Sequence, residues 1–94
     1  MQLLGETHLD ALSRRHQDVR GRLAAWRAEV RAAIWRTPQD IKARYPHASF
    51  LADNRVVFNI KGNHYRIDTQ IAYQTQIVLV IRAGTHAEYD RWTW

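Results

Sequence analysis

The stretch that decides the fold lies in the second half of the chain and reads Arg55-Val56-Val57-Phe58-Asn59-Ile60-Lys61-Gly62-Asn63-His64-Tyr65-Arg66-Ile67. On both sides of its central tripeptide, side chains alternate with a period of two, which is typical of half-buried strands. Lys61-Gly62-Asn63 has the composition of a tight turn. The stretch therefore predicts a β-hairpin with one face turned towards a core.

A third strand is expected from Ile77 to Arg82, and we expect Gly84 to end it. This segment is apolar on both faces, which indicates a strand inside the sheet. Just beyond it, Thr85-His86-Ala87-Glu88 has the pattern of a capping box. A short helix should therefore begin at His86 and reach about Trp92.

Helices are predicted before the hairpin. Residues 1–5 could form a short strand, and Thr7-His8-Leu9-Asp10 resembles another capping box, so a helix should follow to about His16. From Val19 the apolar residues recur as one helical stripe, made of Val19, Leu23, Trp26, Val30 and Ala33/Ile34. Thr37-Pro38 should start a short helix that Tyr45-Pro46 ends.

These elements predict an α+β fold: two N-terminal helices packed on a small antiparallel β-sheet, with a short C-terminal helix. The 94 residues fit a single domain over residues 1–94, because so short a chain cannot bury two cores. No apolar run is long enough for a membrane span, and no signal peptide is evident. We therefore expect a cytoplasmic protein that does not bind membranes.

The charge of the chain favours a polyanionic partner. Lys and Arg number 14 against 9 Asp and Glu, for a net charge of +5, and twelve of the fourteen are Arg, whose planar group binds phosphate and stacks on bases. A merely solvated basic surface is the alternative. There is no Cys, the carboxylates are scattered singly, and no His spacing suits zinc, so we expect no cofactor and no metal.

The hairpin residues 55–67 and the segment Gly84-Thr85-His86-Ala87-Glu88-Tyr89-Asp90 resemble the HigB toxin family, as do Trp26, Trp35 and Asp40-Ile41-Lys42 with Tyr45-Pro46. The resemblance spans nearly the whole chain. It implies a RelE-like fold and an enzyme that cleaves mRNA, usually on the translating ribosome. It also implies neutralisation by a cognate HigA-type helix-turn-helix antitoxin, through which the complex would bind operator DNA.

The sequence departs from the family pattern at two places. Asp68-Thr69 stands where the family tends to carry an apolar pair, and Arg82-Ala83-Gly84 stands where a bulkier apolar residue commonly precedes the glycine. Asp68 shares a strand face with Arg66. We therefore expect Asp68 to pair with an arginine and to weaken activity.

Metal-free cleavage of RNA needs a base for the 2′-hydroxyl, positive charge over the phosphorane and an acid for the leaving oxygen. Arg66 projects from the polar face of the hairpin and is the best candidate phosphate clamp; an ion pair with Asp68 or Glu88 is the alternative. Arg82, at the end of its strand, is the second candidate for charge stabilisation. A salt-bridged edge residue is the alternative there.

His86 and Tyr89 lie three residues apart on the C-terminal helix and form the candidate acid/base pair. The alternatives are a bond from His86 to Glu88 and a packing role for Tyr89. For Glu88, capping of Thr85 is favoured over a role as general base. The hairpin tip supplies candidate RNA-binding residues, namely Lys61, Asn63 and His64. Asn63 could instead serve only the turn.

Two further functions compete with mRNA cleavage. A toxin of the same fold could act without catalysis, like the gyrase-inhibiting ParE branch, through the helix ridge Arg20, Arg27 and Arg31. A degenerate copy could still bind antitoxin and operator but no longer cut RNA, a possibility raised by Asp68. The nuclease hypothesis requires Arg66, Arg82, His86 and Tyr89 to converge near one face of the sheet.

Overall fold

The computed structural model describes residues 1–94 and has the expected α+β class. The elements follow the order β1 (Gln2–Leu4), α1 (Thr7–Arg15), the 3-10 turn η1 (Gln17–Val19), α2 (Arg20–Ala32), α3 (Pro38–Arg44), β2 (Ser49–Leu51), β3 (Arg55–Ile60), β4 (Tyr65–Ala72), β5 (Ile77–Thr85) and α4 (His86–Tyr89).

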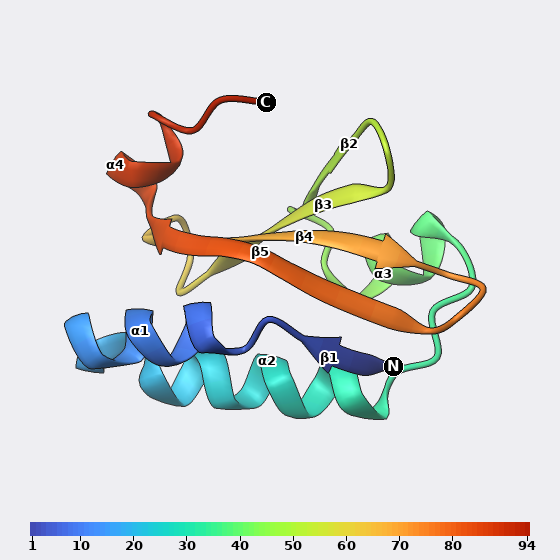
Figure 1. Ribbon diagram of the computed structural model, residues 1–94, viewed down its shortest axis with the longest axis horizontal. Helices are drawn as coiled ribbons and strands as arrows, with labels where there is room; N and C mark the ends of the chain where they lie inside the picture. The colour runs from blue at the N-terminus through green and yellow to red at the C-terminus, as the bar shows by residue number, and fades with distance from the viewer.

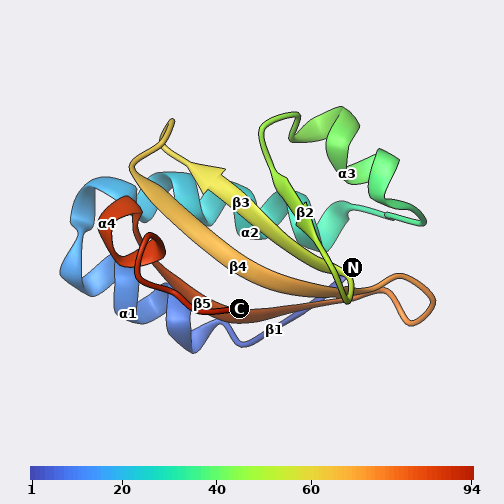
Figure 2. The same ribbon diagram turned by 90° about the horizontal axis from the view of Figure 1, so that it is seen from above.

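The strands form one five-stranded sheet in the order β1-β5-β4-β3-β2. Helices α1 and α2 lie along one side of the sheet, whereas α4 and the C-terminus lie on the other (Figure 1). Seen from above, α3 lies beyond β2, away from α1 (Figure 2). We call the side opposite α1 and α2 the outer face.

The core lies between the sheet and the two long helices. The predicted apolar stripe is buried there: Val19 of η1 and Leu23, Trp26 and Val30 of α2 are at most 2% exposed. Phe58 of β3 meets the Trp26 ring edge-on, with 5.3 Å between ring centroids. Ile34 was wrongly placed in the stripe: the helix ends at Ala32 and the Ile34 side chain is 66% exposed.

The predicted hairpin is confirmed as β3 and β4, paired from Arg55 with Gln70 to Ile60 with Tyr65. Two features of the sheet were not predicted. The short strand β2 pairs antiparallel with Arg55–Val57, and β1 joins β5 in parallel, so that the sheet is mixed rather than purely antiparallel.

The third strand is longer than predicted, because β5 continues to Thr85 and Gly84 does not end it. Gly84 pairs with Arg66 of β4 within the ladder. A Cβ atom there would lie 3.2 Å from both Glu88 Cβ and Trp92 Cζ2. The glycine therefore serves a close approach of the C-terminal segment to the sheet rather than a break in the strand.

A β-bulge in β5 decides which way Arg82 points. Thr69 pairs with Val80 and Asp68 with Arg82, so one extra residue, Ile81, separates the two pairs. Strict alternation from the buried Val78 and Val80 would have placed Arg82 in the core. The extra residue instead moves Arg82 to the outer face, next to Asp68.

The helix starts were predicted with mixed success. Thr85 and Glu88 form the expected capping box: Glu88 N donates to Thr85 Oγ1 at 3.2 Å, and Thr85 N donates to Glu88 Oε1 at 3.1 Å. The box predicted at Thr7 is wrong, because α1 is preceded by Glu6 and has no side-chain cap. Helix α4 ends at Tyr89, earlier than predicted, and no helix in the structure has the length and apolar character needed to cross a membrane.

Candidate functional site

Two neighbouring rows of residues cross the outer face of the sheet. In one row, Arg66 of β4 lies between Asn59 of β3 and Gly84 of β5. In the next, Asp68 lies between Val57 and Arg82. Both predicted charge-stabilising arginines therefore project to the same face, two residue pairs apart along the ladder.

Arg66 is a buried cation that pairs with no carboxylate. Its residue is only 7% exposed, and its Nη1 donates to the backbone oxygens of Asn63 at 2.8 Å and Tyr65 at 3.2 Å. Its Cζ lies 5.2 Å from the ring centroid of Tyr89. An ionised group with so little water needs compensation, and here only two carbonyls and one aromatic ring supply it.

His86 and Tyr89 lie beside this arginine, as the nuclease hypothesis requires. Their ring centroids are 6.4 Å apart, and the backbone N–H of His86 donates to His64 O at 2.9 Å. The Nδ1 atom of His86 lies 3.2 Å from Asp90 Oδ2. At this distance Asp90 can accept a hydrogen bond from Nδ1–H, which leaves Nε2 free to exchange a proton with a bound molecule. We call Asn63, Arg66, His86, Tyr89 and Asp90 the Arg66 cluster.

The hairpin tip adjoins the Arg66 cluster through its backbone. Asn63 and His64 contribute the carbonyl oxygens that bind Arg66 and His86. The side chain of Lys61 turns towards the helices, where Nζ donates to Asp18 Oδ2 at 2.7 Å. This bond, followed by the one from the Tyr65 hydroxyl, lowers the pKa of the Asp18 carboxyl. Asn63 and His64 are thus beside the site, whereas the Lys61 ammonium is engaged elsewhere.

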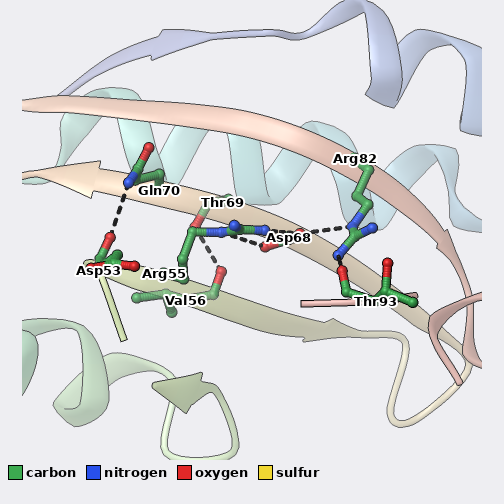
Figure 3. A network of polar contacts seen from close by, with 8 residues as sticks. All are labelled: Asp53, Arg55, Val56, Asp68, Thr69, Gln70, Arg82 and Thr93. Atoms are coloured by element: carbon green, nitrogen blue, oxygen red, sulfur yellow. Dashed lines mark hydrogen bonds and ion pairs between the residues drawn. The ribbon is translucent and has the colours of Figure 1, made fainter. Parts of the chain in front are cut away.

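Arg82 has a different environment, which Figure 3 shows from close by. Its Nε donates to Asp68 Oδ2 at 2.8 Å and its Nη2 to Thr93 O at 3.1 Å. Arg55 binds the same carboxylate through Nε and Nη2. The guanidinium carbon of Arg82 also lies 4.5 Å from the ring centroid of Trp92 and 4.7 Å from that of Trp94. We call Arg55, Asp68, Arg82, Trp92 and Trp94 the Arg82 cluster.

The structure decides between several pairings left open by the sequence. Asp68 does pair with arginines, as expected, but these are Arg55 and Arg82 rather than Arg66. Glu88 caps Thr85 and contacts Arg15 at 3.5 Å. The hydrogen bond from the Thr85 backbone is the main cause that lowers the pKa of Glu88. Neither carboxylate pairs with Arg66, and His86 bonds Asp90 instead of Glu88.

Three of the four predicted catalytic residues, Arg66, His86 and Tyr89, are linked by direct contacts. Tyr89 touches Arg66 and His86, and its ring centroid lies 5.6 Å from that of Trp92 and 6.2 Å from that of Trp94. The two tryptophans in turn contact Arg82. Arg82 thus reaches the other three only through the aromatic residues of the C-terminal segment.

Several residues of these clusters were missed by the sequence reasoning. Asp90 lies four residues after His86 on a predicted helix, a spacing that places two side chains on one face and could have revealed the pair. The contact of Arg55 with Asp68 depends on the register between β3 and β4, which the sequence does not reveal. No local pattern indicates that Trp92 and Trp94 fold back over the sheet.

The helix ridge Arg20, Arg27 and Arg31, named above as a possible working surface of a non-catalytic toxin, is partly neutralised. Arg27 Nη2 lies 2.7 Å from Asp10 Oδ1, and Arg31 Nη2 lies 2.5 Å from Glu6 Oε1. Only Arg20 of the three has no carboxylate partner. No group of three His, Asp or Glu side chains is arranged to hold a metal ion.

The whole arrangement brings a buried arginine, a histidine oriented by a carboxylate and a tyrosine hydroxyl to one end of the outer face. Such a set can bind a phosphate group and move a proton beside it. The chemistry fits a phosphodiester better than a neutral substrate, because the buried cation has no anion of its own.

Comparison with known proteins gave one family and a group of named relatives. The model of a family described as HigB_toxin, the RelE-like toxic component of a toxin-antitoxin system, matches residues 19–92. The chain is 24% identical over 95 residues to the mRNA interferase toxin HigB of Escherichia coli strain K12, an alignment that covers 99% of this chain and 91% of that protein. The same values hold for the proteins named mRNA interferase HigB in Escherichia coli O157:H7 and Shigella flexneri.

Proposed function

Because this chain belongs to the HigB family of RelE-like toxins, we propose that it is a metal-independent endoribonuclease that cleaves mRNA and thereby stops translation. The printed names of the three relatives, all mRNA interferases, support this activity. The proposal includes cleavage on the translating ribosome and neutralisation by a cognate HigA-type helix-turn-helix antitoxin. Through that antitoxin the complex would bind operator DNA.

The observation that carries the proposal is the environment of Arg66. Arg66 is 7% exposed as a residue, and its guanidinium lacks a counter-ion; burying such a charge lowers the stability of the fold, so stability does not explain why it is there. The phosphodiester of a bound RNA would supply the missing negative charge, and a charge-assisted bidentate contact is the strongest one that Arg makes. Arg66 is therefore assigned to the scissile phosphate.

The other roles follow from position. His86, oriented by Asp90, exchanges protons with the 2′-hydroxyl or the leaving 5′-oxygen. Tyr89 lies between Arg66 and His86, where its hydroxyl can donate to a phosphate oxygen or its ring can stack on a base. Asn63 and His64 at the hairpin tip contact the RNA backbone next to this site, whereas Lys61 would first have to release Asp18 in order to reach it. Arg82 contributes positive charge from a greater distance, because Asp68 and Thr93 occupy two of its donors.

A direct test expresses the chain in growing cells with and without its antitoxin and maps the 5′ ends of mRNA. We expect new internal 5′ ends and growth arrest without the antitoxin, and neither with it. Arg66→Ala and His86→Ala should remove the new ends while antitoxin binding survives. Arg14→Ala, at an exposed arginine of α1 with no ion pair, is the matched control and should cut normally. Intact transcripts in arrested cells would contradict the proposal.

A second candidate function is a toxin of the same fold that binds antitoxin or another target without cutting RNA. The observation that favours it is the engagement of Arg82 by Asp68 and the C-terminal segment. A gyrase-type target contacted by the α2 ridge is less well supported, since Arg27 and Arg31 are already paired. Growth arrest with intact mRNA and with DNA damage signalling would identify that case.

A further inference from the structure

A hollow of about 460 Å³ lies between the hairpin tip and the connection from α3 to β2. Its wall includes Arg44, Tyr45 and His47 on one side and Asn59, Gly62 and Asn63 on the other. Strand β2 pairs with β3 only as far as Val57, so this end of β3 has no neighbouring strand on that edge. The hollow is therefore a gap at the sheet edge, and volumes of this size accept small organic ligands.

The hollow is continuous with the Arg66 cluster. Asn59 is the cross-strand partner of Arg66 on the outer face. Asn63, on the same wall, accepts the 2.8 Å hydrogen bond from Arg66 Nη1 through its backbone oxygen. A chain molecule whose phosphate binds Arg66 could therefore extend past Asn59 and Asn63 into the hollow.

The chemistry of the wall suits one unit of a polyanion. No carboxylate lines the hollow, whereas Arg44 and His47 both do, and the side chain of His47 is exposed. His47 takes part in the local structure only through its backbone oxygen, which accepts from Asn59 Nδ2 at 3.1 Å. Its ring is thus free to stack on a flat ligand. The asparagine amide and the edge of β3 offer hydrogen-bond donors and acceptors of the kind that bases require.

A second, smaller hollow of about 270 Å³ prolongs the first towards α2. It shares Arg44, Asn59 and Gly62 with the first and adds Arg22, which has no carboxylate partner. Glu29 also lines it, but that carboxylate is already bound by Arg44 and by the Tyr45 hydroxyl. Glu29 in turn offsets part of the charge of Arg44, so Arg22 is the cation of the second hollow that no carboxylate neutralises.

We propose that the first hollow binds the unpaired nucleotide next to the scissile one, with its base against His47 and its phosphate towards Arg44. This inference rests on the proposed function, because it takes the RNA at Arg66 as its starting point. A duplex does not fit a hollow of this kind, since its bases are stacked and paired within the helix. The site selects single-stranded RNA, whose bases can turn outwards into a pocket.

Binding of short RNA tests the site without relying on cleavage. The probes are a fluorescent hexanucleotide and a dinucleotide, both 2′-O-methylated so that they cannot be cut, and the measurement is fluorescence anisotropy. Wild-type protein should bind the hexanucleotide at least about 10-fold more tightly than the dinucleotide, in keeping with one stacked base. That gain should disappear in His47→Ala. Arg44→Ala should lower the slope of log K against log salt by about 0.7, the value of one phosphate contact.

Matched controls separate the hollow from general effects. His8→Ala and Arg14→Ala change exposed residues of α1 and should leave the affinity for the hexanucleotide as in wild type. Equal binding of the hexanucleotide by wild type, His47→Ala and Arg44→Ala would overturn the nucleotide site while leaving the proposed function intact. Failure of wild type to bind either probe would overturn the site as well, whereas failure to cut mRNA in cells would overturn only the proposed function.

Discussion

The two arginines of the outer face lie on adjacent strands and two residue pairs apart, yet their environments are opposite. Arg82 donates to a carboxylate and a carbonyl and has two indole rings against it. Arg66 is more deeply buried but has only carbonyl oxygens and one tyrosine ring. The cation of Arg82 is paired with a carboxylate of the protein, whereas Arg66 has none, because Asp90 of its cluster binds His86. The comparison indicates that Arg82 stabilises the fold, whereas Arg66 is placed to bind an anionic ligand.

The Arg82 cluster contains a buried carboxylate, Asp68, whose burial must be compensated. Its carboxylate is fully buried, and an isolated carboxylate there would cost several kcal/mol. Arg55 and Arg82 together supply the charge and hydrogen bonds that compensate it. The bulge at Ile81 is the device that brings Arg82 to this carboxylate. Asp68 pairs with arginines, as expected. Because these are Arg55 and Arg82, Arg66 stays unpaired, and we no longer expect Asp68 to weaken activity through Arg66.

The largest effect should come from Asp68→Asn, which leaves two half-buried arginines without their carboxylate. Breaking a buried pair costs about 3–5 kcal/mol, and we expect about 3 because both arginines keep some contact with water. Urea unfolding measures the loss. Asp10→Asn is the control: its pair with Arg27 lies at the surface, so the change should stay below about 1 kcal/mol. Equal losses for the two variants would show that Asp68 is not the centre of the cluster.

The next effect distinguishes the two arginines directly. Arg66→Met should lower the rate of RNA cleavage by about 100-fold or more, as removal of one charge-stabilising group does. It should not lower the stability, because it removes a buried charge that no carboxylate neutralises. Arg82→Met should show the reverse, with a loss of about 2 kcal/mol in stability and a smaller loss of cleavage per folded molecule. Cleavage rates and urea unfolding on the same samples provide the comparison, and the opposite pattern would exchange the two roles.

The sequence predicted those parts that depend on local patterns. The hairpin was predicted from the alternation of its side chains, and the core stripe of α2 from the spacing of its apolar residues. The cap at Thr85 was predicted from the four-residue capping box that ends at Glu88. The sheet face to which the Arg82 side chain projects could not be predicted, because one bulged residue in β5 moves every later side chain of the strand to the opposite face. Gly84 was misread for a related reason. A glycine that permits close packing looks, in sequence, the same as one that ends a strand.

The candidate site was predicted in part for the same reasons. Arg66, His86 and Tyr89 come together because they belong to the hairpin and to a capped helix, both predicted locally. The pairing of Asp68 with Arg55 depends on register, and the cover of Arg82 by Trp92 and Trp94 depends on the path of the last residues. Contacts between residues far apart in the sequence produce no characteristic spacing, so they could not be predicted from the sequence.

A smaller effect is expected at Gly84, which lies in the same row as Arg66 and under Trp92 of the Arg82 cluster. Gly84→Ala would place a Cβ atom 3.2 Å from Trp92 Cζ2 and from Glu88 Cβ, so the C-terminal segment must shift. We expect a loss of about 1 kcal/mol and a change in tryptophan fluorescence. Gly21→Ala is the control, because a Cβ there meets nothing within 4 Å, and a helical alanine should raise stability by about 0.5 kcal/mol. Unchanged fluorescence in Gly84→Ala would indicate that the two clusters are not coupled through this glycine.

The smallest effect concerns pH and the helix that carries His86 and Tyr89. The backbone N–H of Thr85 donates to Glu88 and holds the pKa of that carboxyl below its ordinary value of 4.5. A carboxyl whose pKa is lower in the folded state contributes stability above its unfolded pKa and loses it as pH falls through the folded pKa. The cap of α4 should therefore weaken as pH falls from about 4.5. The pH-dependent change in tryptophan fluorescence reports it, since Trp92 packs against Tyr89.

Glu88→Gln should flatten that pH dependence, because an amide oxygen accepts the Thr85 hydrogen bond but does not titrate in this range. Thr85→Val is the matched control: it removes the hydroxyl yet keeps the backbone donor that is the main cause of the shift, so most of the pH dependence should remain. If Thr85→Val abolished it and Glu88→Gln did not, the cap would not be its source. A loosened α4 would disturb the Arg66 cluster before the Arg82 cluster, because His86 and Tyr89 lie on that helix whereas Asp68 and its arginines lie on strands.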